Sequence, residues 1–369
     1  MYELPGVRLE SDLPLDAFAP FLTEEGSDLP LVTLHAVQQS APMDGIRFSA
    51  SQRVIVTEQL ENGWRFSRSD WPGAVLDASA DYRSLTLYLP EHPVSQDQFT
   101  PLIRTALECA SIRQGVMSVH SASVLLDGEA VCFSAPSGTG KSTRAVSWQS
   151  ALGAELISGD RPAIRLTKTG GIVCGVPWDG KECHYRNIRA PLKALCMLRR
   201  GDFTRVRRLS PAQIRRELMH QCFIPMWDTD TAAEAMMLVT MMARRLPVYR
   251  VICGPDGDAA RALREILYHH PEEIREIEEE MKIKNGFILR NLADEYVVMP
   301  TGDNITKFDG TIVLSEVAAF VWEKLTQSAT RSELADYILA EYEIDRATAE
   351  RDLDALLAKL RSYGVLEDC

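Results

Sequence analysis

The sequence has no long apolar segment, no excess of basic residues and no paired cysteines. Every long apolar stretch of the 369-residue chain is interrupted by Arg, Asp or Gly, so we expect no membrane-spanning helix, which needs about 18 apolar residues. The formal net charge is -12, and an acidic surface repels the phosphates of nucleic acids and of anionic membranes. We therefore expect neither a nucleic acid nor a membrane as a partner.

Cysteine is present but scattered. The eight Cys residues form no C-x-x-C pair, and a Cys and a His are neighbours only at Cys183–His184. This spacing is typical of reduced, structural cysteines and does not favour a zinc site. The first residues, MYELPGVRLESDLPLD, contain neither a basic segment nor an apolar core, so we expect no signal peptide and a cytoplasmic location.

The pattern of the chain predicts an α/β protein of several domains. Strands that alternate apolar and polar residues predict a β-rich N-terminal lobe over residues 1–95. Alternating helices and strands predict an α/β domain over residues 96–270. A highly charged segment over residues 271–286 reads as a linker, and residues 287–369 are expected to form a small separate domain.

A glycine-rich loop is the strongest chemical motif. SAPSGTGKST, residues Ser134–Thr143, departs from the phosphate-binding pattern G-x-x-x-x-G-K-[ST] only at its first position, where Ala135 replaces glycine. A methyl group is tolerated there if φ is negative. In such a loop the backbone N–H groups cradle phosphates, Lys141 reaches the β- and γ-phosphates, and Ser142 binds Mg²⁺. A plain turn or a decayed loop is the alternative. The expected nucleotide-binding residues are Ser137, Gly138, Thr139, Gly140, Lys141, Ser142 and Thr143.

The loop has strand-like neighbours. SASVLLDGEAVCFSA predicts a hairpin that turns at Asp127–Gly128 and leads into the loop, and AELIS follows the next helix as a strand. That strand ends in Gly159–Asp160–Arg161. A carboxylate there can accept a proton from an attacking hydroxyl or help to hold Mg²⁺, although an ordinary surface turn would look the same.

Other polar residues near these strands are weaker candidates. His120 precedes the hairpin and is a candidate for the active site or a structural histidine. The loop GVPWDGKE concentrates polar groups around an aromatic residue, which suits either a substrate lid or a turn. The candidate substrate contacts are Arg161, Trp178, Asp179 and Lys181.

These features together resemble the HPr kinase/phosphorylase family and its phosphoenolpyruvate-carboxykinase-like relatives. The resemblance covers about His120–Asp258 and comprises a His before a hairpin, the loop, one short helix and an acidic strand end. It implies a P-loop kinase that uses ATP and Mg²⁺, with Lys141 on the phosphates, Ser142 and Asp160 on the metal, Asp160 as general base and His120 supporting the site. HPr kinases are hexamers, which leaves a homo-oligomer open.

One departure from that family affects the expected activity. HPr kinases end the strand after the loop with two aspartates, whereas this chain has Gly159 at the first position and Asp160 at the second. If the first carboxylate were the essential one, activity would be weak or absent.

The C-terminal segment predicts a strand hairpin followed by three helices and a return strand. Two strands flank Asp309–Gly310, Thr330 and Glu333 form a capping box, and Gly364 ends the last helix. The apolar face of the first helix is expected to comprise Val317, Phe320, Val321 and Leu325.

This pattern resembles PqqD, the peptide chaperone of pyrroloquinoline quinone biosynthesis. The resemblance implies a winged-helix-like α+β domain that binds a leader peptide as an added strand. A plain, DNA-binding winged helix is the alternative. The segment from Gly286 onward has 16 acidic and eight basic residues, which argues against DNA.

The two resemblances suggest one function. Our leading hypothesis is an ATP–Mg²⁺-dependent kinase that phosphorylates a Ser or Thr hydroxyl of a ribosomally made precursor peptide, whose leader is bound by residues 287–369. Two alternatives stay open: a nucleotide-regulated peptide escort without kinase activity, and a kinase for a small metabolite.

Overall fold

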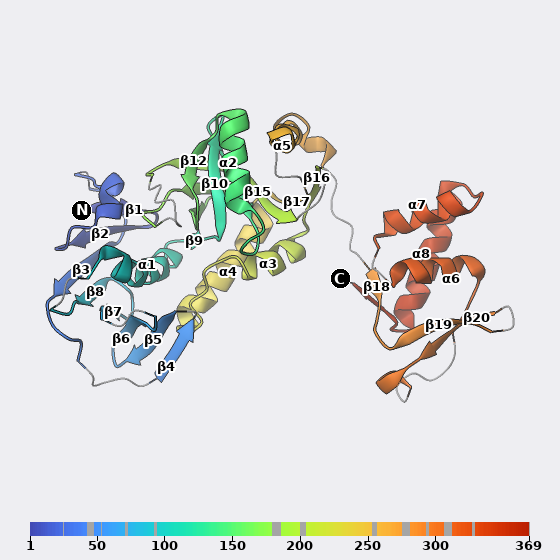
Figure 1. Cartoon of the computed structure of the whole chain (residues 1–369), viewed down its shortest axis with the longest axis horizontal. Coiled ribbons are helices and arrows are strands. Elements are labelled where there is room, and N and C mark those ends of the chain that lie inside the picture. The colour runs from blue at the N-terminus through green and yellow to red at the C-terminus, as the bar shows by residue number, and fades with distance from the viewer. Residues whose placement is uncertain are drawn as a thin grey trace. The chain divides into compact units, whose positions relative to one another are not determined.

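In the computed structural model the chain forms two compact units, Met1–Glu276 and Ile277–Cys369 (Figure 1). The structure describes every residue except 25, 43–47, 53, 71–72, 92–93, 179–185, 200–203, 253–256, 275–280, 293–294, 306–311, 327–328 and 369. Among the helices of this described part, none combines the length and the apolarity needed to cross a membrane.

The first unit begins with an eight-stranded sheet of order β1-β2-β3-β8-β7-β6-β5-β4. β2 and β8 both run parallel to β3, and the other neighbours are antiparallel. Side chains alternate between the two faces of a strand, and one face buries residues such as Leu34, Leu76 and Leu85. The strands are β1 (Tyr2–Leu4), β2 (Val7–Ser11), β3 (Leu31–Val37), β4 (Phe48–Gln52), β5 (Ile55–Leu60), β6 (Gly63–Arg68), β7 (Val75–Ser79) and β8 (Ser84–Tyr88), with a 3₁₀ helix, η1 (Asp16–Phe21).

Helix α1 (Gln96–Ile112) packs on this sheet and joins it to the rest of the unit (Figure 1). Phe99, Leu102 and Ile103 of α1 belong to the same apolar core as the sheet. That core also contains Ala163 and Cys174 from the second sheet. The predicted boundary at residue 95 therefore separates two sheets that share a core within one compact unit.

The second sheet has nine strands. Seven follow the order β12-β10-β11-β15-β14-β13-β9, while β17 pairs with β15 and β16 with β17. β11, β15 and β17 are mutually parallel, and the first residues of β15 also pair with β14. The strands are β9 (Val116–Ser118), β10 (Ser121–Leu126), β11 (Glu129–Ser134), β12 (Glu155–Ser158), β13 (Ala163–Leu166), β14 (Gly171–Cys174), β15 (Arg189–Arg199), β16 (Arg205–Arg208) and β17 (Val248–Ile252).

The described part of the first unit contains four more α-helices. α2 and α5 pack together and share a core with β10 and β11, where Trp148 of α2 meets Phe133 edge to face at 5.3 Å. α3 begins with a capping box of Ser210 and Gln213 and packs on α4. The helices are α2 (Lys141–Leu152), α3 (Pro211–Met219), α4 (Thr229–Arg245) and α5 (Gly257–His269), followed by the 3₁₀ helix η2 (Pro271–Glu273).

The second unit is an α+β domain. β18 pairs with β22, and β19, β20 and β21 form an antiparallel sheet with β21 at one edge. Three helices pack into a core around Trp322, which is 1% exposed. The elements are β18 (Met281–Ile283), β19 (Phe287–Leu292), β20 (Glu295–Pro300), η3 (Gly302–Asn304), β21 (Ile312–Leu314), α6 (Glu316–Leu325), α7 (Arg331–Glu341), α8 (Arg346–Ser362) and β22 (Leu366–Asp368).

The structure refines the predictions for this unit. The capping box of Thr330 and Glu333 is confirmed. The expected face of α6 is partly wrong, because Val317 is 38% exposed whereas Trp322 is buried. Met281–Ile283 form a strand of this unit, so part of the predicted linker is folded. The predicted turn at Asp309–Gly310 lies outside the described residues.

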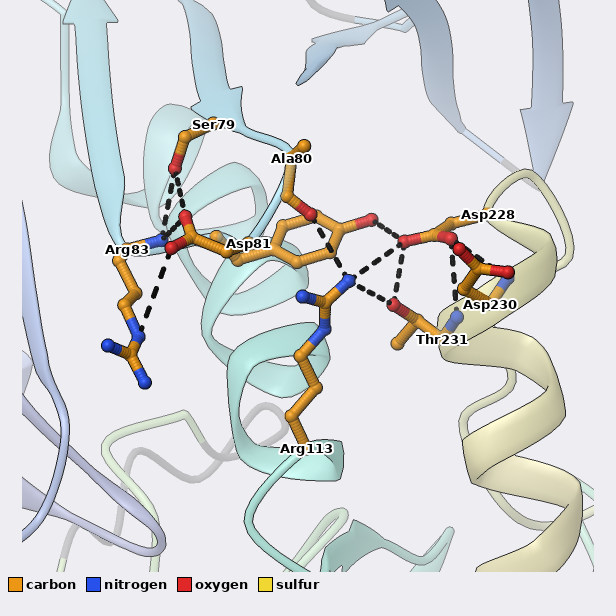
Figure 2. Close-up of polar contacts among 9 residues, drawn as sticks. Ser79, Ala80, Asp81, Arg83, Arg113, Asp228, Asp230 and Thr231 are labelled. Carbon is orange, nitrogen blue, oxygen red and sulfur yellow. Dashed lines mark hydrogen bonds and ion pairs between the residues drawn. The ribbon is translucent and has the colours of Figure 1, made fainter. Parts of the chain in front are cut away.

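A buried carboxylate ties the N-terminal sheet to helix α4. Asp228 is 6% exposed and caps α4 by accepting the N–H groups of Asp230 and Thr231. Its Oδ2 also accepts the hydroxyl of Thr231 at 2.6 Å and that of Tyr82 at 2.8 Å. Figure 2 shows Asp228 next to both Thr231 and Arg113, and Nη2 of Arg113 lies 3.8 Å from Oδ2 of Asp228. The charge is thus compensated on several sides.

We predict that Tyr82→Phe lowers the free energy of unfolding of the first unit by about 1.5–3 kcal/mol, because it removes a hydrogen bond to a buried charged group. Urea unfolding followed by tryptophan fluorescence would measure it. Tyr363→Phe, at an exposed tyrosine of the second unit, is the control and should change stability little. Equal stability of Tyr82→Phe and wild type would contradict the proposed role of this hydrogen bond.

Candidate functional site

The glycine-rich loop has two residues in a backbone conformation that favours glycine. Gly138 and Gly140 have φ of +78° and +102°, a region that strongly favours glycine. Among the described residues other than glycine, only Tyr82, Asp127 and Arg161 have positive φ, so Ala135 has the negative φ that tolerates its methyl group. Ala135 is fully buried. The departure from the glycine pattern therefore introduces no backbone strain.

Helix α2 begins at the loop with its N-terminus open. Gly140 is the N-cap, no side chain caps the helix, and no acidic residue lies in its first turn. The first N–H groups of a helix have no acceptor within the helix and carry its positive dipole end. They are therefore available to an anion.

Lys141, the first residue of α2, lies against the loop. Its Nζ donates to the carbonyl oxygens of Ala135 at 3.0 Å and Pro136 at 3.4 Å. Burial lowers the pKa of this ammonium group; Asp160 opposes the shift and Arg161 adds to it. The lysine predicted to bind phosphates thus lies near the predicted base.

His120 and Asp160 meet at the same corner of the second sheet. Nε2 of His120 lies 3.8 Å from Oδ1 of Asp160, and Nδ1 lies 3.2 Å from Oε1 of Gln221. Burial lowers the pKa of His120, Lys141 and Arg161 lower it further, and Asp160 and Gln221 raise it. The imidazole is therefore favoured in its neutral form near pH 7.

Buried serines hold this corner together, and sequence reasoning did not identify them. Ser134 donates to the carbonyl of His120 at 2.9 Å, and Ser158 donates to the carbonyl of Asp160 at 2.8 Å. The N–H of Arg161 donates to the carbonyl of Ser121 at 3.1 Å. Ser134 carries no distinctive sequence signal, because its partner precedes a different strand, whereas the partner of Ser158 lies two residues further along the same segment.

A pocket of about 530 Å³ opens beside Asp160. Its walls come from the first residues of β5, from α1, and from the segment between α3 and α4. Pockets of this volume commonly hold ligands. The lining includes Val54, Ile55, Arg104, Glu108, Asp160, Arg161, Phe223, Met226 and Trp227.

Of the four predicted substrate contacts, the structure places one in this pocket. Arg161 lines the pocket. Trp178 does not; it is 7% exposed and packs edge-on against Phe18 in the core of the first unit. Asp179 and Lys181 lie outside the described residues.

The chemistry of these residues fits Mg²⁺ and a nucleotide. The exposed hydroxyl of Ser142 and the partly exposed carboxylate of Asp160 are hard oxygen donors, which Mg²⁺ prefers. The open helix end and Lys141 suit phosphates. Ser142 and Asp160 thus carry the type of donor atom that such a metal would need.

The second unit has an apolar groove of about 430 Å³ beside an unpaired strand edge. β21 pairs only with β20 among the described strands, and Val313 on it is 51% exposed. Such edges readily accept another strand. The groove is lined by β21, by the helices α6, α7 and α8, and by Ile344 between α7 and α8. Val317, which was expected on the apolar face of the first helix, lies on its wall together with Leu356.

Comparison with known proteins identifies this unit. Residues 295–366 match the family described as coenzyme PQQ synthesis protein D (PqqD), so the chain carries a C-terminal PqqD domain. The structure of TbiB1 in complex with the TbiA(beta) leader peptide is 30% identical, covers 23% of this chain and 94% of its own, and has a TM-score of 0.21. The structure of lasso peptide synthetase B1 complexed with the leader peptide is 22% identical. The match covers 24% of this chain and 98% of that one, and its TM-score is 0.21. No curated protein matches the chain.

We predict that His120 titrates below the ordinary value of 6.5. The folded chain then binds this proton less tightly than the unfolded chain. The free energy of unfolding should therefore decrease as the pH falls below 6.5. NMR titration of the imidazole would measure the pKa in three proteins. Lys141→Ala should raise it relative to wild type, and Asp160→Asn should lower it. Shifts of opposite sign would refute the observed arrangement of the three groups.

Proposed function

We propose that the chain is an ATP- and Mg²⁺-dependent kinase that phosphorylates a Ser or Thr hydroxyl of a ribosomally made precursor peptide, with the leader of that peptide bound by the PqqD domain. The observation that carries the kinase half is the meeting of Lys141, at the phosphate-type loop, with Asp160 and His120 at one corner of the sheet. The observation that carries the peptide half is the PqqD match over residues 295–366.

In the proposed phosphoryl transfer each group has a separate role. The N–H groups at the start of α2 and the ammonium of Lys141 bind and orient the phosphates. Asp160 accepts the proton of the attacking hydroxyl, whose oxygen forms a bond to the γ-phosphorus as the bond to the bridging oxygen of ADP breaks. Neutral His120 keeps Asp160 oriented without adding a competing positive charge. Mg²⁺ held by Ser142 and Asp160 would offset charge on the phosphates.

The edge of β21 supports binding of an extended peptide. A strand added there would gain backbone hydrogen bonds, and alternate side chains would fill the groove lined by Val317 and Leu356. A leader peptide is also the ligand in the two complexes named above. Catalysis and recruitment are thus assigned to different units, joined in one chain.

We predict that a precursor peptide encoded beside the gene gains one phosphoryl group when incubated with ATP, Mg²⁺ and the full-length protein. Asp160→Asn should slow transfer by about 10²–10⁴-fold, since it removes the general base, and Lys141→Ala should abolish it. Intact-mass spectrometry measures the product. Asp258→Asn, which changes an exposed carboxylate of α5, is the control. Tight peptide binding without transfer would reject the kinase and favour a nucleotide-regulated escort.

We further predict that Val317→Asp weakens leader binding by tenfold or more, because it sets a charge in the apolar groove. Isothermal titration with the leader peptide measures the affinity. The matched control is Leu292→Asp, since Leu292 is 52% exposed and lies on β19 at the opposite edge of the sheet. Equal losses in both variants would argue against binding at β21.

A further inference from the structure

The pocket beside Asp160 joins the N-terminal sheet to the candidate catalytic corner. Val54 and Ile55 line it from the sheet, and Arg104 and Glu108 line it from α1. Asp160 and Arg161 line it from the end of β12. The reacting hydroxyl must reach Asp160, so a pocket that contains Asp160 is suited to the acceptor. The N-terminal sheet therefore supplies part of the wall of this pocket.

The charges in this pocket balance one another. Two lining residues are positive, Arg104 and Arg161, and two are negative, Glu108 and Asp160. Nε of Arg104 lies 3.3 Å from Oε1 of Glu108, whose side chain is only 3% exposed. Arg104, whose side chain is 24% exposed, thus compensates the charge of the buried Glu108 carboxylate, and this pair adds no net charge to attract an ionic ligand. The balance favours a neutral acceptor.

The pocket also has an apolar rim. Met226 is 67% exposed and Val54 is 41% exposed, although both line the pocket. Behind them, Trp227 packs edge-on against Phe223 at 6.0 Å and against Phe66 of β6 at 5.7 Å. The aromatic cluster fixes the wall, while the exposed methionine and valine are left to contact a ligand.

We infer that this pocket binds the acceptor segment of the peptide and selects a Ser or Thr flanked by bulky apolar side chains. The hydroxyl lies toward Asp160, and the flanking side chains pack on Met226, Val54 and Trp227. The N-terminal sheet is thus a specificity element for the residue that is phosphorylated. This inference rests on the proposed function, but it concerns a different site from the leader groove, which belongs to the other unit.

The test compares two methionine substitutions in the full-length chain. Met226→Asp introduces a charge at the apolar rim, and Met237→Asp introduces the same charge at a methionine of α4 that is 58% exposed and does not line the pocket. With the neighbouring precursor peptide as substrate, Met226→Asp should raise the peptide KM tenfold or more and leave the ATP KM and the leader affinity unchanged. Met237→Asp should match wild type. Thermal unfolding checks that both variants are folded.

Two synthetic leaderless peptides test selectivity directly. Wild type should phosphorylate acetyl-Leu-Ser-Phe-amide at least tenfold more efficiently than acetyl-Asp-Ser-Asp-amide, and Met226→Asp should reduce that preference. If the precursor is phosphorylated but neither the preference nor the Met226→Asp effect is observed, the acceptor pocket is refuted and the proposed function survives. If wild type phosphorylates neither the precursor nor the synthetic peptides, the proposed function fails and this inference fails with it.

Discussion

The position of β10 between β11 and β12 is the constraint on which the candidate site depends. β10 is antiparallel to both neighbours, and Ser121 and Ser123 lie opposite Ser134 and Ser158. The start of β10 therefore meets the ends of the other two strands. His120 precedes β10, the loop follows β11 and Asp160 follows β12. His120, the glycine-rich loop and Asp160 therefore converge because of this pairing.

The same corner explains why small polar residues are buried there. Ser134 and Ser158 are at most 1% exposed, and a buried hydroxyl without a partner is costly. Each donates to the carbonyl of a residue in the site. Their hydrogen bonds satisfy the serines and restrain the backbone at His120 and Asp160 together. The same two hydrogen bonds therefore explain both why the serines are buried and why the backbone is restrained at this corner.

Local signals made much of the fold predictable. The turn at Asp127–Gly128, the helix after the loop and the capping box at Thr330 each depend on neighbouring residues. Pairings between distant strands have no such signal, so the parallel pairing of β2, β3 and β8 was not predicted. Lys141 and Asp160 could be named from sequence because each belongs to a local pattern. The pocket lined by Val54, Arg104 and Met226 could not be predicted, because these residues come from segments far apart in the sequence. Trp178 looked like a lid residue, and only tertiary packing reveals that its ring is buried.

Strand β15 has a consequence for how the first unit comes apart. Its first residues pair with β14, residues 192–197 pair with β11, and residues 195–199 pair with β17. Removing β15 would break both parts of the sheet at once, so neither part can open fully while the other stays closed. The backbone amides of β15 should thus exchange with deuterium only through global opening. Proteases would accordingly meet a chain that is either wholly resistant or wholly exposed across this sheet.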